Sequence, residues 1–389
     1  MTKKILISGA GIAGLTTAYW LTEHGHQVTV VERATEIRDG GYKVDIRGAA
    51  VDVIRRMGLL EDVRRLSTEV REAAFVDKDG KTVATMDADL FGGRAHDDVE
   101  VLRGDLTQLL YRKTKAELVF GDSIVDINDT RVTFESGRTD TFDIVIGADG
   151  LRSVTRELVF GDGGLRELGY YVSIFDVPNH LGLDREERTY VEPGRTALMY
   201  STRGDANAKA MFLFASEPLD YNRRDAAQQR KLLADAFTGA GWEVERLLAA
   251  APEAKGFYFD SLSLVELDTW SKGRVVLTGD AAFCATPASG QGTSLALVGA
   301  YVLAGEIAAN DTHEQAFAAY EQQMRGFAEA NQKLGPENVR GMVIGKRWQI
   351  RAQLAVLRML PKLPGKEKMA GRIADKIHRA ATAITLKDY

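Results

Sequence analysis

The chain has 389 residues and a formal net charge of −5 at pH 7, with 45% hydrophobic and 27% charged residues. This composition is that of an ordinary globular protein, and the length favours two domains. One cysteine excludes a disulfide framework and a cysteine-rich metal site, and the six histidines show no metal-binding spacing. We therefore expect no metal centre and a cytoplasmic location.

The stretch 4–33 predicts a nucleotide-binding βαβ unit. An apolar run leads into the spacing GxGxxG at Gly9, Gly11 and Gly14, a helix-length segment follows, and a second apolar run ends at Glu32. In this fingerprint the first glycine permits a tight turn, the second lets the backbone approach a pyrophosphate, and the third allows close helix–strand packing. The helix N-terminus offers N–H groups to phosphates, and Glu32 is placed to bind a ribose diol.

The segment that follows predicts alternating helices and strands. Residues 49–57 fit an amphipathic helix, and residues 72–86 fit a hairpin that turns at an Asp-Gly pair. Asp105 is the expected N-cap of a helix over 106–115, and a buried strand is expected at 142–146.

From residue 168 to 267 the texture changes to β-rich segments separated by Gly, Pro, Asn and Asp. This pattern predicts an antiparallel sheet inserted into the nucleotide-binding domain. One of its strands alternates Phe212 and Phe214 with Met211 and Leu213. Since alternate side chains point to opposite faces, one pair faces the ligand side of the sheet, and the pattern leaves open which pair does so.

After this sheet the chain predicts a parallel-type strand ending at Gly279 and Asp280, and then a helix from about Gly292 to Ala309. The weakly polar run 293–305 inside that helix is expected to be too short to span a bilayer.

The C-terminal part is basic. From Arg340 onward there are 12 Lys/Arg and 3 Asp/Glu, which gives this segment a charge of +9 against −14 for the remainder. A basic segment of this kind is typical of binding to nucleic acid, to a membrane, or to the acidic body of the protein itself. We favour docking on the body, because four apolar residues fall on one helical face at Val343, Ile350, Leu354 and Leu357.

Two distant segments carry a more specific pattern. Residues 143–156 read DIVIGADGLRSVTR, and residues 273–293 read GRVVLTGDAAFCATPASGQGT. Together with the glycine fingerprint, they resemble the single-component FAD-dependent monooxygenases of the para-hydroxybenzoate hydroxylase fold, in order and spacing over residues 1–335. Many relatives have histidine where this chain has Phe283, a change that leaves flavin binding unaffected. The adjacent Cys284 is expected to be a small buried residue.

The resemblance implies an α/β protein with a discontinuous Rossmann-type FAD-binding domain, an inserted antiparallel-sheet substrate domain, and a C-terminal helix that bridges them. The expected boundaries are 1–70, 100–167 and 268–336 for the FAD-binding domain, 71–99 and 168–267 for the substrate domain, and 337–389 for the C-terminal helical segment.

The expected FAD contacts combine these motifs. Asp280 lies at the carboxyl edge of the sheet, where it can hold a ribityl hydroxyl, and the helix that opens at Gly292 presents its positive end to a reduced flavin. The full set is Gly9, Gly11, Ile12, Ala13, Gly14, Glu32, Arg33, Asp45, Arg103, Asp280, Pro287, Gly290, Gly292 and Thr293.

The resemblance assigns further roles to single residues. Arg103 reaches the ribityl–phosphate region of FAD, and Asp45 lies near the isoalloxazine, whereas the role of Arg47 is open. Arg38 is a candidate contact for the nicotinamide cofactor, or a solvated surface arginine. Asp149 and Arg156 belong to a segment that supports FAD and the nicotinamide; equally, Arg156 pairs with a carboxylate.

The implied activity is that of an enzyme in which NADPH or NADH reduces FAD. Oxygen then adds at flavin C4a, and the hydroperoxide hydroxylates an electron-rich aromatic or enolic carbon, so no catalytic side chain is assigned. The chain has no second nucleotide-binding βαβ unit, which fits a nicotinamide that visits and leaves. The expected partners are O₂ and a small aromatic or polyketide substrate, without nucleic acid or membrane, and the expected state is a monomer.

Within the family, the motifs VDIRG (44–48) and TPASG (286–290) are most similar to the tetracycline-inactivating branch. This narrower resemblance implies inactivation of a tetracycline-type antibiotic. The alternatives are a hydroxylase of another phenolic or polyketide metabolite, a flavin-dependent reductase, and a flavoprotein that sequesters a drug without turnover.

Overall fold

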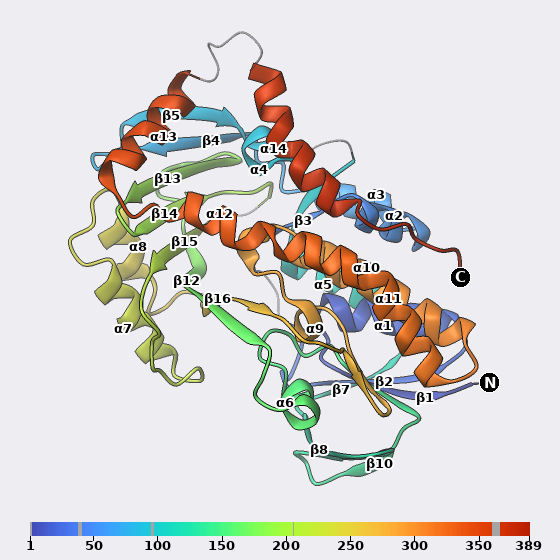
Figure 1. Ribbon diagram of the computed structural model, residues 1–389. Helices are drawn as coiled ribbons and strands as arrows, with labels where there is room; N and C mark the ends of the chain where they lie inside the picture. Colours follow the sequence, from blue (N-terminus) through green and yellow to red (C-terminus); the bar gives the residue numbers. More distant parts are fainter. Residues whose placement is uncertain (1, 38–40, 95–96, 205, 360–365) are drawn as a thin grey trace.

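The computed structural model describes residues 2–37, 41–94, 97–204, 206–359 and 366–389, with side chains at 366–373 left undescribed (Figure 1). Within these residues the chain forms two large sheets, two small sheets and helices that cover them. It is a mixed α/β protein, as the sequence predicts.

The first large sheet carries the glycine fingerprint. Its strands lie in the order β17 (Ser271–Lys272), β18 (Val275–Leu277), β11 (Ile144–Gly147), β1 (Lys4–Ser8), β2 (Gln27–Glu32) and β7 (Glu117–Phe120). All neighbours are parallel except the short β17, so the carboxyl ends of β1, β11 and β18 share one edge. That edge is where open α/β sheets bind ligands.

The two faces of this sheet are covered differently. One face packs on helices α1 (Ile12–Glu23), α5 (Arg103–Lys113) and α10 (Gly292–Ala309). The other face packs on a small sheet made of β8 (Ile124–Asn128), β9 (Arg131–Phe134) and β10 (Thr139–Thr141). The predicted N-cap at Asp105 is wrong, because α5 begins at Arg103 with Leu102 as its N-cap.

Helix α10 runs through the centre of this half. It has 18 residues and is long and apolar enough to cross a membrane by length and composition, which corrects the expectation that this segment is too short. However, 83% of it is buried inside the protein. A helix that is apolar on all sides and buried is typical of a core element.

The second large sheet has seven strands. Their order is β16 (Tyr258–Val265), β12 (Leu165–Pro178), β15 (Asn207–Ala215), β14 (Arg195–Tyr200), β13 (Glu186–Glu192), β4 (Glu72–Val76) and β5 (Thr82–Asp87). The hairpin predicted at 72–86 is confirmed as β4 and β5. Neighbouring strands are antiparallel except for the parallel pair of β13 and β4, which joins this hairpin to the rest. Helices α7 (Ala226–Ala236) and α8 (Val244–Ala250) cover one face.

Shorter elements connect the two sheets. Strands β3 (Lys43–Ile46) and β6 (Val99–Leu102) form a two-stranded ladder. The remaining helices before the C-terminal part are α2 (Ala49–Arg56), α3 (Leu60–Arg65), α4 (Ala88–Gly92), α6 (Val154–Phe160), α9 (Asp280–Phe283), the 3₁₀ helix η1 (Pro287–Ser289) and α11 (His313–Gln332).

The described residues of the C-terminal part form α12 (Leu334–Met342), α13 (Arg347–Met359) and α14 (Lys366–Ala381), whereas the sequence predicts a bridging helix within a helical segment at 337–389. Helix α12 contacts η1, α13 contacts β5 and β13 of the seven-stranded sheet, and α14 returns to α11 (Figure 1). The tail then packs on α10, where a Cβ built on Gly305 would lie 2.2 Å from the Tyr389 ring. Tyr389 Oη also donates to Glu306 Oε1 at 2.8 Å.

Candidate functional site

The fingerprint glycines meet two different packing demands. Gly9 has φ +103°, and a Cβ on it would lie 2.6 Å from the carbonyl oxygen of Ala148. A Cβ on Gly14 would lie 1.9 Å from the carbonyl oxygen of Gly9. The nearest atom to a Cβ on Gly11 is Arg103 Nη2, at 3.8 Å. Packing inside the protein therefore requires glycine at positions 9 and 14, whereas the space beside Gly11 is open to a ligand.

Among the described residues, three helices of at least eleven residues begin beside this edge without a side-chain cap. They are α1 with Gly11 as N-cap, α5 with Leu102 and α10 with Gln291, and no acidic residue stands in the first turn of α1 or α10. By contrast, α6 and α11 are capped by Ser153 and Thr312. Free N–H groups and the positive end of the helix dipole at α1 and α10 favour a phosphate or an electron-rich ring edge. Ile12, Ala13 and Thr293 are buried in these first turns.

Asp280 and Arg103 stand between the helix starts. Asp280 is solvent-accessible, and a Cβ on Gly292 would lie 3.9 Å from its Oδ1. Although accessible, the carboxyl is surrounded by protein that displaces much of the bulk water, which raises the pKa of Asp280, and the nearby Arg103 opposes that rise. The structure therefore brings Gly11, Arg103, Asp280 and Gly292 together, as expected.

Glu32 ends β2 at the same edge. Its Oε2 accepts from the Ala10 N–H at 2.9 Å, and its Oε1 accepts from the Ala34 N–H at 2.8 Å. Each carboxylate oxygen has a further lone pair, so the side chain can still accept from a hydroxyl. Arg33 is exposed beside it. The nicotinamide candidate Arg38 lies outside the described residues.

Gln291 is a site residue that sequence reasoning did not single out. The residue is fully buried, yet its Nε2 and Oε1 have no hydrogen-bond partner within the described part of the chain. Its backbone N–H donates to Ser289 Oγ at 3.1 Å. A buried amide without partners is costly unless something satisfies it. The only signal in the sequence is a glutamine between two glycines at a helix start.

The loop before α10 borders Asp45. A Cβ on Gly290, which has φ +66°, would lie 3.9 Å from Asp45 Oδ2, and Pro287 is exposed in η1 of the same loop. Arg94 Nη1 lies 3.4 Å from Asp45 Oδ1. Although burial raises the pKa of Asp45, the guanidinium groups of Arg47 and Arg94 together hold that pKa below its usual value. Asp45 therefore carries a negative charge beside the loop.

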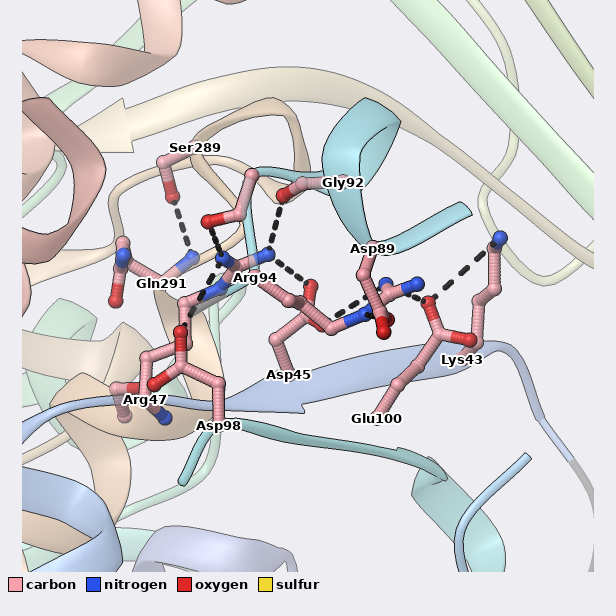
Figure 2. A network of polar contacts seen from close by, with 12 residues as sticks. Lys43, Asp45, Arg47, Asp89, Gly92, Arg94, Asp98, Glu100, Ser289 and Gln291 are labelled. Atoms are coloured by element: carbon pink, nitrogen blue, oxygen red, sulfur yellow. Dashed lines mark hydrogen bonds and ion pairs between the residues drawn. The ribbon is translucent and has the colours of Figure 1, made fainter. Parts of the chain in front are cut away.

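Arg47, whose role the sequence left open, is the centre of this network (Figure 2). Its guanidinium donates to the carbonyl oxygens of Gly92 and Gly93 and to Asp45 Oδ2, each at 2.8 Å. Its backbone N–H donates to Ser294 Oγ in α10 at 3.1 Å. Arg47 is only 3% exposed, so this buried cation ties β3, α4 and α10 together.

The segment after β11 has a supporting role in the structure. Asp149 accepts from the N–H and the hydroxyl of Thr155, both at 2.9 Å, and so fixes the start of α6. Arg156 donates to the carbonyl oxygens of Ala281 at 3.1 Å and Leu151 at 2.7 Å. Within the described residues no ion pair is formed between Arg156 and a carboxylate, although Asp149 acts on it electrostatically. Its hydrogen bonds instead hold α9, which begins at Asp280.

Comparison with known proteins identifies the family. The FAD binding domain family model matches residues 2–334. An uncharacterized protein of Mycobacterium tuberculosis is 43% identical over 87% of this chain and 94% of its own length. A flavin-dependent monooxygenase of Legionella longbeachae is 39% identical over 85% of this chain and 87% of its own length. The chain belongs to the FAD-dependent monooxygenases.

A solved structure also matches this monooxygenase along its whole length. The tetracycline destructase Tet(51) is 34% identical, covers 100% of both chains and superposes with a TM-score of 0.88. The predicted family, fold class, enzyme class and FAD cofactor are thereby confirmed. The uncapped helix starts, the open space beside Gly11 and the orphaned Gln291 amide are features of this chain that fit FAD.

The seven-stranded sheet of the monooxygenase turns one face toward this site. Phe212 and Phe214 lie on the opposite face, where Phe212 packs edge-on against Phe237, just after α7, with ring centroids 4.9 Å apart. Met211 and Leu213 belong to the face toward η1 and α12. The buried cluster on that face comprises Val172, Ile174, Leu213, Leu262, Ala288, Val339 and Val343. Met211 and Leu213 therefore lie on the face toward the proposed flavin residues, which is the flavin-side face.

Two tyrosines border the same cluster. Tyr42, just before β3, and Tyr258 on β16 have ring centroids 6.0 Å apart. Both are half-buried, and neither hydroxyl has a hydrogen-bond partner among the described residues. Burial raises the pKa of both phenols, so both stay protonated and can donate. Arg103 acts electrostatically on both rings, which places them beside the proposed flavin residues.

The two residues after Ala282 are structural. Phe283 is buried and packs against Trp270 with ring centroids 4.8 Å apart. Cys284 is also buried, and burial raises the pKa of its thiol well above the usual value. Cys284 is therefore a neutral thiol and not a reactive thiolate.

Proposed function

We propose that this monooxygenase hydroxylates an electron-rich aromatic or enolic substrate of the tetracycline type, with NADPH or NADH as the reductant. The whole-length similarity to a tetracycline destructase carries this proposal. The half-buried tyrosine pair and the apolar cluster beside it support a planar, partly polar substrate, because they offer aromatic surface and two donors together.

The proposal places FAD on the residues described above. Gly9, Gly11 and Gly14 with Ile12 and Ala13 form the turn and first helical turn that receive the pyrophosphate, and Glu32 with Arg33 borders the adenosine ribose. Arg103 and Asp280 hold the ribityl chain. Asp45 and the N-terminus of α10 face the isoalloxazine. Further contacts come from Pro287, Gly290, Gly292 and Thr293, and the Gln291 amide, which has no partner within the described part of the chain, supplies a hydrogen bond.

When bound, FAD supplies the activation of molecular oxygen. The chain supplies a fixed and dry surrounding for it. The Arg47 network keeps the loop before α10 in place, and the sheet face excludes water from the substrate. The neutral phenols of Tyr42 and Tyr258 donate to oxygen atoms of the substrate and orient its ring. In this arrangement 71–99 and 168–267 form the substrate domain, and the FAD-binding domain comprises the other segments before residue 337.

The experiment measures NADPH oxidation and oxygen uptake by the purified flavin-loaded protein, with and without tetracycline. We expect tetracycline to stimulate both rates, with little hydrogen peroxide and a product heavier by one oxygen atom. Binding of tetracycline without oxygen uptake would instead indicate a sequestering flavoprotein. Stimulation only by other phenols or polyketides would indicate a different substrate for the same kind of hydroxylation. Failure to bind FAD would contradict the proposed site.

A further inference from the structure

Helix α13 is amphipathic, and its inner face is occupied. Ile350 is 7% exposed and Leu354 and Leu357 are half-buried, in a helix that contacts β5 and β13 of the seven-stranded sheet. These residues are the apolar stripe that the sequence predicts to dock on the body. The inner face therefore needs no further partner.

The outer face of α13 is also apolar, which the sequence analysis missed. Trp348 is 65% exposed, Val356 54% and Met359 57%, and these are the three most exposed large apolar side chains among the described residues. The exposed Ala352 and Ala355 lie between them. At 3.6 residues per turn these five positions fall on one side of the helix, opposite the stripe that meets the sheet.

Basic residues flank this outer stripe. Residues 338–366 contain seven Lys/Arg and no Asp/Glu. Arg347, Arg351 and Arg358 are exposed and follow each other along one flank of α13, with Lys346 just before the helix. None of these four has an ion pair or a side-chain hydrogen bond within the described part of the chain.

The expected docking on the body is thus made by the apolar stripe of α13, which contacts β5 and β13, and not by the cations of this helix. Among the described side chains of the basic segment, cations further along the chain pair with that body: Lys376 binds Glu337, and Lys387 Nζ lies 2.5 Å from Glu306 Oε1. The cations of α13 remain in solvent beside exposed apolar side chains, an arrangement with no evident benefit to the isolated molecule.

We propose that α13 binds the surface of an anionic lipid bilayer, lying flat with Trp348, Val356 and Met359 among the headgroups. A helix with an apolar stripe, a tryptophan and a basic flank is typical of an interfacial anchor. Thirteen residues make a helix about 20 Å long, which suits the plane of the membrane rather than a span. Binding through this face is independent of the substrate proposed above.

Charge argues against the other occupants of this face. A twofold contact with a second copy uses the same patch on both chains, so it would bring two positively charged faces together. Nucleic acid would neutralise the arginines but would leave the three apolar side chains in water. A bilayer with acidic headgroups satisfies both parts of the face.

The experiment is co-sedimentation of the full-length flavin-loaded protein with vesicles. We expect binding to vesicles of phosphatidylglycerol and phosphatidylcholine at low salt, weaker binding at high salt, and little binding to phosphatidylcholine alone. Arg351→Gln/Arg358→Gln should lower the partition coefficient about 30-fold, on the basis of two lost surface charges. Trp348→Ser/Met359→Ser should also weaken binding while keeping the charges.

The matched control is Arg65→Gln/Lys115→Gln, which removes the same charge from side chains that are 73% and 75% exposed outside this face. We expect it to bind vesicles within about twofold of wild type. Trp348 emission should shift to the blue with anionic vesicles, with wild-type minus Trp348→Phe spectra isolating its signal. Equal binding by all variants, no binding of wild type, or a dimer held together by α13 would each overturn the proposal.

Discussion

The two large sheets offer their proposed ligands different kinds of contact. At the six-stranded sheet the contacts offered come mainly from the backbone. They are glycines without a side chain, uncapped helix starts, and a few polar groups at strand ends. At the seven-stranded sheet the contacts offered come from side chains on one face, which are an apolar cluster and two tyrosines. A change in the first sheet should therefore affect flavin binding, and a change in the second should affect the substrate.

The largest effect is expected within the fingerprint itself. Gly14→Ala places a Cβ 1.9 Å from a backbone oxygen, so we expect loss of at least about 3 kcal/mol of stability and little folded protein. Gly11→Ala has room inside the protein but intrudes on the cofactor. We expect it to fold like wild type and to bind FAD at least about tenfold more weakly. Denaturant unfolding of the flavin-free proteins and FAD titration separate the two effects.

Wild-type FAD affinity in Gly11→Ala would contradict the placement of the pyrophosphate. Gly14→Ala tests packing rather than cofactor binding. A stable Gly14→Ala protein would show that the contact between Gly14 and the carbonyl of Gly9 can relax.

A second prediction concerns the Arg47 network, which ties β3, α4 and α10 together. Arg47→Met removes the buried cation closest to Asp45, whose side chain is 15% exposed, and leaves two carbonyl oxygens without donors. Removing one partner of a buried ion pair costs about 3–5 kcal/mol, so we expect a clearly lower free energy of unfolding. The control is Arg55→Met on α2, whose side chain is 47% exposed and which should change stability by less than about 0.5 kcal/mol. Similar stabilities for the two variants would show that the Arg47 network is dispensable.

A third prediction compares the two faces of the seven-stranded sheet. Tyr258→Phe removes a donor from the flavin-side face, and we expect KM for the hydroxylated substrate to rise about 2- to 10-fold with FAD affinity unchanged. Tyr171→Phe on the opposite face removes a hydroxyl that accepts from the Leu219 N–H at 2.8 Å. That variant should lose a little stability and keep its KM. If Tyr171→Phe raised KM more than Tyr258→Phe, the assignment of the faces would be reversed.

The smallest expected effect is a pH dependence in the nucleotide-binding half. Burial, with Lys3 and His24 nearby, lowers the pKa of His26 from 6.5 to about 4. Its Nδ1 accepts from the Lys3 N–H at 3.2 Å, which requires the neutral ring. The unfolded state therefore binds a proton first as pH falls, so stability is present above pH 6.5 and decreases toward pH 4.

His26→Asn keeps an acceptor without a titrating group, so its melting temperature should fall less between pH 6.5 and pH 4 than that of wild type. Parallel melting curves for the two proteins across this range would show that His26 does not contribute.

The sequence predicted the nucleotide-binding half well because its constraints are local. Gly14 meets the carbonyl of Gly9 earlier in the same turn, and Gly9 meets Ala148 at the end of the neighbouring strand β11, so the spacing of the glycines carries the information. The position of Arg103 beside Gly11 followed only from the family resemblance. The start of α5 was misplaced because Asp105 is also a good N-cap, and propensity alone does not choose between them.

Features that depend on distant partners were not predicted. Tyr42 and Tyr258 are more than 200 residues apart in the chain, and nothing in either segment indicates their contact. Arg47 binds carbonyl oxygens, which have no side-chain signature. The two faces of β15 look alike in sequence because both are apolar, so only the helices α7 and α8 and the loop at η1 distinguish them.

The tail that packs on α10 has a consequence for how the protein is made. Asn331 donates to the Ala380 carbonyl at 3.0 Å, Tyr301 donates to the Lys387 carbonyl at 2.7 Å, and the Tyr389 ring fills the space beside Gly305. Residues at the N-terminus thus share a core with residues synthesised more than 300 positions later. The nucleotide-binding half therefore lacks part of its core until residues 380–389 have been synthesised, so we expect a nascent chain that stops before residue 380 to leave this half incompletely folded.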